Sequence, residues 1–160
     1  KCDVYGNDLS TDTIYRLFHP TKALQPVITR TPSVLDDKEG YFMDLYGITS
    51  QFYFFRFSSR QLSFEAGNYK IIDEKSKNAI YDRKDGKLYH PKFSNKDYPS
   101  MEKFDLRFSE EVDACATIEF EAFYLIEALE VGELSGKLKT VAERLKEDDN
   151  PVLMVVKFKE

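Results

Sequence analysis

Residues Gln51–Phe57 read QFYFFRF and form the densest aromatic run in the chain. Successive side chains of a strand point to opposite faces, so Phe52 and Phe54 would face one way and Tyr53, Phe55 and Phe57 the other. A strand that is apolar on both faces is either covered on both sides or keeps one side for binding. Because aromatic residues favour strands and fill cores, core packing is the first interpretation.

Upstream of this run, the chain is punctuated by Pro20, Pro26 and Pro32, which interrupt any helix. A short extended piece fits between them at Thr13–Phe18. We therefore expect an irregular N-terminal segment over residues 1–40 and a β-rich body over residues 41–160. The length favours a single domain covering residues 1–160.

Downstream of the run, turn signals separate further strands. Arg60-Gln61 predicts a turn into a strand at Leu62–Phe64. Lys84-Asp85-Gly86 predicts a hairpin that joins residues 78–83 to residues 87–90, because Asp-Gly readily takes the positive φ of a tight turn. Apolar and polar residues alternate in Phe104–Ser109 and again in Cys115–Ile126, as they do on half-buried strands.

The C-terminal part combines a helix with a strand. Apolar residues at helical spacing predict a helix over Ser135–Glu147, with Ser135 as its N-cap, and VLMVVKF at 152–158 predicts a strand beside an earlier one. The region 123–131 is open to two interpretations. Glu, Ala and Leu favour a helix from Phe123 onward, but the β-type residues before it favour one long strand, and we expect the strand.

The expected fold class is therefore α+β: a mostly antiparallel β-sheet with one helix at about 135–147 and a C-terminal strand at about 152–158. A hydrophobic content of 42% excludes a disordered chain. No apolar run reaches the length of a membrane-spanning helix, so we expect no transmembrane segment. A net charge of −5 makes nucleic acid an unfavourable partner, because phosphate neutralisation dominates that kind of binding.

The acidic charge is concentrated in one part of the chain. Between Ser109 and Glu133 there are eight acidic residues and no Lys or Arg. A solvated sheet face is the simplest explanation, and an acidic surface that attracts a basic partner is the alternative. From this run and from the aromatic run, the candidate binding residues are Tyr53, Arg56, Glu119 and Glu121.

Candidate catalytic residues are few. His19 and His90 are the only histidines, and either could act as a general base beside a carboxylate, with Asp82, Asp85 and Asp97 near His90 in the sequence. Cys115 could be a nucleophile, but no base or glycine-rich turn adjoins it in the sequence. No ligand spacing predicts a metal site, and no glycine motif predicts a cofactor. Cys2 and Cys115 could pair or stay free.

These observations favour a non-catalytic binding or interaction domain that recognises an unknown protein or glycan. One alternative is a small hydrolase- or isomerase-like enzyme that uses His90 with a nearby carboxylate. Another is a structural envelope component that self-associates. The first residue is Lys1, which is consistent with removal of a signal peptide, so we expect a secreted or cell-envelope protein.

Overall fold

The structure is a computed structural model that describes residues 4–6, 11–18, 20–36, 41–65, 68–102, 104–108 and 115–159, with the backbone alone over 60–65 and 68–74. The chain forms two compact units, Lys1–Pro91 and Lys92–Glu160. The single domain expected over 1–160 stays a prediction. None of the helices in the described ranges is long and apolar enough to cross a membrane.

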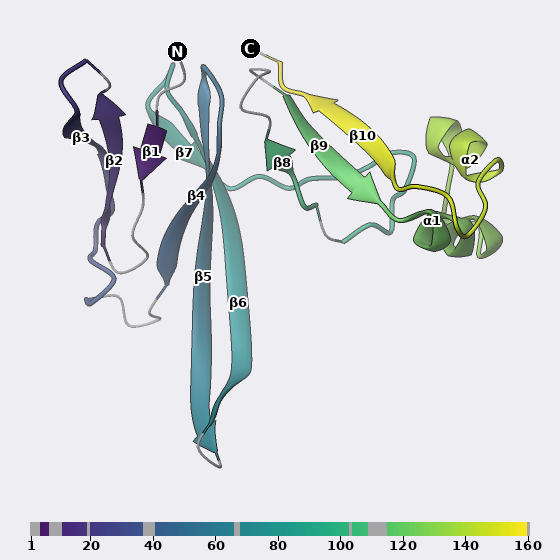
Figure 1. Ribbon diagram of the computed structural model, residues 1–160, viewed down its shortest axis with the longest axis horizontal. Coiled ribbons are helices and arrows are strands. Elements are labelled where there is room, and N and C mark those ends of the chain that lie inside the picture. Colours follow the sequence, from purple (N-terminus) through teal and green to yellow (C-terminus); the bar gives the residue numbers. More distant parts are fainter. Residues whose placement is uncertain are drawn as a thin grey trace. The chain divides into compact units, whose positions relative to one another are not determined.

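The N-terminal unit begins with a three-stranded antiparallel sheet, ordered β1 (Val4–Gly6), β2 (Thr13–Phe18) and β3 (Ala23–Thr29) (Figure 1). Strand β2 has the bounds that the sequence predicts. Pro26 lies in β3, which is an edge strand and can tolerate a residue without an N–H group. Residues 1–40 therefore hold more regular structure than their prolines indicated.

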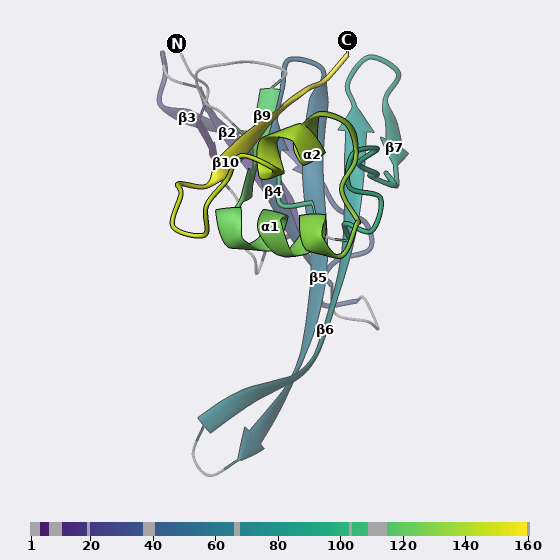
Figure 2. The same ribbon diagram turned by 90° about the vertical axis from the view of Figure 1, so that its right-hand side faces the viewer.

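A four-stranded antiparallel sheet follows, ordered β4 (Phe42–Ile48), β5 (Phe52–Glu65), β6 (Asn68–Asp82) and β7 (Lys87–Tyr89). Strands β5 and β6 form a long hairpin whose far part extends beyond β4 (Figure 2). The turn expected at Arg60-Gln61 is wrong, because β5 stays paired with β6 there and only its register shifts. The hairpin between β6 and β7 is confirmed, and Gly86 has the positive φ of +70° that its turn requires.

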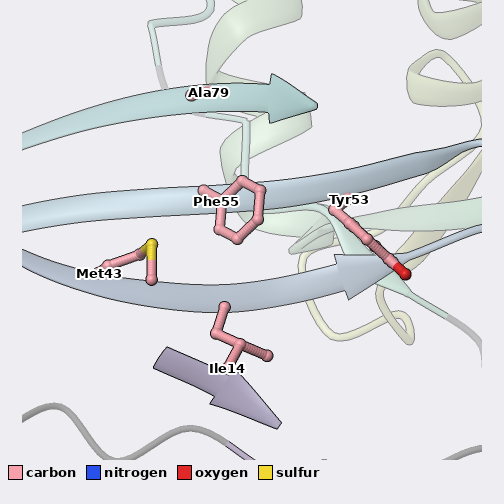
Figure 3. Packing of buried hydrophobic residues seen from close by; sticks show 5 residues of the cluster. All are labelled: Ile14, Met43, Tyr53, Phe55 and Ala79. Atoms are coloured by element: carbon pink, nitrogen blue, oxygen red, sulfur yellow. The ribbon is translucent and has the colours of Figure 1, made fainter. Parts of the chain in front are cut away.

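The core of this unit lies between the two sheets (Figure 3). It consists of five buried side chains from four strands: Ile14, Met43, Tyr53, Phe55 and Ala79. The face of β5 that carries Tyr53 and Phe55 is therefore a core face, as the aromatic run predicts. Phe54, on the opposite face, is also fully buried, and its ring makes edge contacts with Phe52 and Tyr46.

The C-terminal unit holds a three-stranded antiparallel sheet, ordered β10 (Val152–Lys157), β9 (Cys115–Phe120) and β8 (Arg107–Phe108). Strand β9 alternates strictly, with Ala116, Ile118 and Phe120 buried. The C-terminal strand is confirmed, and it pairs with β9, an earlier strand, as expected. Side-chain burial also alternates along β10, where Leu153 and Val155 lie on the exposed face of the strand.

Two helices connect β9 to β10: α1 (Ala122–Glu130) and α2 (Gly136–Ala142). The expectation of one helix and of a long strand through 123–131 is therefore wrong. Strand β9 ends at Phe120, and α1 buries Ala122, Leu125 and Ala128 at three-residue spacing, which only a helix places on one side. The strong helix propensity of Glu, Ala and Leu thus decides this region. Helix α2 ends five residues before the predicted Glu147.

A loop residue, Asp97, caps helix α2. Its carboxylate accepts hydrogen bonds from the backbone N–H groups of Lys137 (2.9 Å) and Leu138 (3.2 Å). Ser135 holds the N-cap position that the sequence predicts, but its hydroxyl donates to the carbonyl of Lys96 and makes no capping bond to the helix. Gly136 allows this arrangement, because a Cβ at that position would lie 2.4 Å from Asp97 Oδ1.

Candidate binding groove

A hollow of about 560 Å³ opens in the N-terminal unit between β3 and the inner face of the four-stranded sheet. We call it the β3–β7 groove. Its walls come from five strands and their adjoining residues, and its lining consists of Val27, Ile28, Thr29, Arg30, Thr31, Tyr41, Met43, Phe55, Phe57, Lys77, Tyr81, Leu88 and His90. The volume falls within the range of typical ligand pockets, about 300–1,000 Å³.

The pairing of residues between neighbouring strands places the side chains that form the floor of this groove. Met43 pairs with Phe57, and Phe57 pairs with Lys77, so these three side chains form one row across β4, β5 and β6. Tyr81 and Leu88 are paired in the same way on β6 and β7. Because Met43 and Phe55 are almost fully buried, the floor is apolar and its positions are fixed by the core.

Polar side chains line the rim of the groove around this apolar floor. Arg30 donates a hydrogen bond from Nη1 to the carbonyl oxygen of Tyr41, which ties the end of β3 to the start of β4. Lys77 Nζ lies 4.4 Å from the centroid of the Tyr41 ring, within the range of a cation–π contact. The groove therefore combines an apolar floor with a cationic rim.

Asp12 fixes the chain segment that follows β3. Its backbone carbonyl accepts a hydrogen bond from Arg30 N (2.7 Å), and its carboxylate accepts bonds from Ser33 Oγ and Val34 N (2.6 Å each). These two bonds, the one from Ser33 first, lower the pKa of the Asp12 carboxyl. The ionised carboxylate thus holds the segment that carries Arg30 and Thr31 into the groove wall.

His90 lies on the exposed rim of the groove, where its Nδ1 is 3.3 Å from the carbonyl oxygen of Asn78. The three carboxylates that the sequence suggests as its partners all have other hydrogen bonds. Asp82 binds Gln51 and Lys84 N, Asp85 binds Tyr89 and Lys87 N, and Asp97 caps α2. Within the described residues, His90 makes no hydrogen bond to a carboxylate that would make it a general base.

The other catalytic candidates lie elsewhere. His19 and Cys2 are outside the described residues. Cys115 is a half-buried free thiol at the start of β9 in the C-terminal unit. In the described ranges, no group of three or more His, Cys, Asp or Glu side chains could hold a metal ion.

Of the candidate binding residues in β5, Tyr53 is buried in the core. It stacks on Tyr81, and Arg83 lies over its ring at 5.1 Å. Burial raises the pKa of the Tyr53 phenol to about 12, with a further contribution from its hydrogen bond to Tyr5. Arg56 is half-buried on the opposite face of the strand, 4.9 Å from the ring centroid of Tyr46.

The acidic candidates belong to the C-terminal unit. Glu119 forms an ion pair with Arg107 across the outer face of the sheet. Glu121 is exposed and holds the extended N-cap position of α1. Part of the acidic run, including Glu110, Glu111 and Asp113, lies outside the described residues. In this unit a second hollow of about 440 Å³ is lined only by residues of one segment, 137–145.

Sequence reasoning singled out His90 but missed the rest of the groove. Its lining residues are spread from Val27 to His90, and most of them are ordinary strand residues. Their pairing across five strands, which no local pattern shows, brings them together. The one available signal was the alternation of β5, which places Phe55 and Phe57 on one face.

Comparisons with known proteins give one informative match. No protein-family model matches the chain, and no curated protein matches it. Its fold is similar to that of a solved structure from Bacteroides fragilis described as a "Putative exported protein", with a TM-score of 0.58 and 15% sequence identity. The match covers 98% of this chain and 48% of the other, so this chain spans about half the length of that protein.

Proposed function

We propose that this chain is a non-catalytic binding domain of an exported protein and that the β3–β7 groove is its binding site. The observation that carries this proposal is the groove itself, which has walls from five strands, a floor fixed by the core and a polar rim. Sites of this kind, mostly apolar with a few polar groups, are typical of ligand recognition. The hydrogen bonding of His90 favours binding over catalysis.

The burial of the aromatic rings that line the groove favours a protein ligand over a glycan. Sugars stack on exposed aromatic faces, but Tyr41 is buried with the Lys77 amine over its ring. Tyr81 stacks on Tyr53, and only 2% of Phe55 is exposed. The groove therefore offers apolar side-chain contacts and hydrogen bonds, which suit the side chains of a peptide.

A matched pair of variants tests the site. Leu88→Glu places a charge in the groove at a half-exposed position, and Leu24→Glu places the same charge on exposed β3 surface outside it. Both variants and the parent are screened against a displayed peptide library and a glycan array. We expect to find ligands that bind the parent protein and the Leu24→Glu variant but do not bind the Leu88→Glu variant. Ligands that bind all three proteins equally would show that the groove is not the site.

Export is supported by the description of the Bacteroides fragilis protein that shares this fold. The test is fractionation of cells that express the full natural protein, followed by detection of this domain with an antibody. Recovery from the envelope or the medium is expected. Recovery from the cytoplasm alone would contradict export and leave the groove proposal untouched.

A second candidate function is self-association through β10. No other described strand pairs with the outer edge of β10, which contains no proline or glycine, and Leu153 and Val155 are exposed on its open face. Such edges readily pair with another strand. Light scattering at high concentration tests this candidate. A dimer that Val155→Lys dissociates would support it, and a monomer at all concentrations would reject it.

A further inference from the structure

We infer that the ligand of the β3–β7 groove is an extended peptide segment in which an apolar side chain stands next to carboxylates. This inference rests on the proposed binding function and adds the chemical class of the ligand. Two features of the groove carry it: the sign of the charge on its rim and the apolar character of its floor.

The rim is positive in a protein that is negative overall. The thirteen described residues that line the groove include Arg30, Lys77 and His90 but no Asp or Glu, whereas the whole chain carries a net charge of −5. Charge complementarity fixes the register of a ligand and disfavours partners of the wrong sign. A cationic peptide would meet like charges in this groove, and an acidic peptide would not.

The two permanent cations have different surroundings. The Arg30 guanidinium binds the Tyr41 carbonyl, and its charge helps to lower the pKa of the Asp12 carboxyl nearby. Part of the Arg30 charge is thus balanced within the protein. Lys77 is exposed, and its amine lies over the ring of Tyr41. Lys77 is the more exposed of the two cations, so its removal is used to report on the charge of a ligand.

The apolar floor lies directly beside this cation. Lys77 pairs with Phe57, and Phe57 pairs with Met43, so the charge stands at the end of an apolar row. A peptide whose apolar side chain contacts Phe57 and Met43 would bring an adjoining carboxylate to the Lys77 amine. An acid next to an apolar anchor fits this arrangement better than an acidic run alone.

Three fluorescent peptides that differ only at two positions test the inference. They are fluorescein-Ser-Glu-Phe-Glu-Ser-amide and the peptides with Gln or Lys in place of both Glu residues, and their affinities are measured by fluorescence anisotropy at low and high salt. We expect the Glu peptide to bind about two- to fivefold more tightly than the Gln peptide at low salt, and the Lys peptide to bind most weakly. High salt should reduce the difference.

Lys77→Gln and Lys87→Gln form the protein arm of the test. Both lysines are exposed on the same sheet, but Lys87 points away from the groove, because its neighbour Leu88 lines it. Lys77→Gln should weaken the Glu peptide about two- to fivefold and leave the Gln peptide unchanged. Lys87→Gln should change neither affinity. Circular dichroism checks that both variants are folded.

Two results would overturn the inference. If the Gln peptide binds as tightly as the Glu peptide and Lys77→Gln has no effect, the groove does not select a carboxylate. If the Glu peptide does not bind, the ligand is not of this class. Neither result decides the proposed function. That proposal is tested separately, by whether ligands from the library bind the parent protein and fail to bind the Leu88→Glu variant.

Discussion

The two units of this protein bury their side chains in different ways. The N-terminal unit places large rings between two sheets, and the sandwich leaves a groove on one side of its core. The C-terminal unit buries small and aliphatic side chains in its helices, such as Ala122, Leu125 and Ala142, and fixes α2 with a loop carboxylate. The comparison separates two kinds of hollow: the one in the N-terminal unit has walls from five strands, whereas the one described in the C-terminal unit is lined by a single segment, 137–145.

The largest effect is expected from the ring core. Phe55 is 2% exposed and also forms part of the groove floor. Phe55→Ala should lower the free energy of unfolding by about 3–5 kcal/mol, measured in urea, because it removes a large buried ring and leaves a cavity. Phe42→Ala is the control, since Phe42 is 37% exposed. Equal losses from the two variants would contradict the assigned core.

The next effect is expected at the cap of α2. Gly132 and Gly136 both have positive φ, but only a Cβ at Gly136 would collide with Asp97. Gly132→Ala should cost about 1–2 kcal/mol for the left-handed backbone alone. Gly136→Ala should cost about 2–3 kcal/mol, because it also displaces the capping carboxylate. If thermal unfolding shows the same loss in both variants, the proposed collision is absent.

A smaller effect is expected from removal of the cap itself. Asp97→Ala should cost about 0.5–2 kcal/mol, because two backbone N–H groups of α2 lose their acceptor. In a Gly136→Ala background the same change should cost less, since Asp97 is already displaced there. A double-mutant cycle measures this coupling. Additive losses would mean that the two residues act independently.

The smallest effect concerns pH. The pKa of Tyr53 is raised to about 12 in the folded protein, chiefly by burial, so the unfolded chain ionises first, near its ordinary value of 10.0. The contribution of Tyr53 to stability is therefore complete below pH 10 and is lost as the pH rises from about 10 to 12. As the pH rises from about 10 to 12, the free energy of unfolding, measured in urea titrations, should fall less for Tyr53→Phe than for the parent protein. Identical pH profiles would contradict the buried phenol.

Local signals in the sequence account for much of this fold. Asp85-Gly86 predicts the hairpin between β6 and β7, and the alternation after Cys115 predicts β9, because each pattern is complete within a few residues. The strand expected after Phe123 is wrong, because β-type and helix-type residues adjoin there and the helix propensity of Glu, Ala and Leu decides the outcome. The cap of α2 was missed, since Asp97 is distant in the sequence from the helix it caps. The groove was missed for the same reason, because it forms only when residues from five strands come together.

Ligand binding in the β3–β7 groove can be tested at single side chains by intermolecular nuclear Overhauser effects between the Phe ring of the Glu peptide and the methyl groups of the groove. We expect contacts with Val27, Ile28 and Met43, which line the groove. Contacts confined to exposed groups outside the groove, such as Leu24 or Val155, would show that the peptide does not bind there.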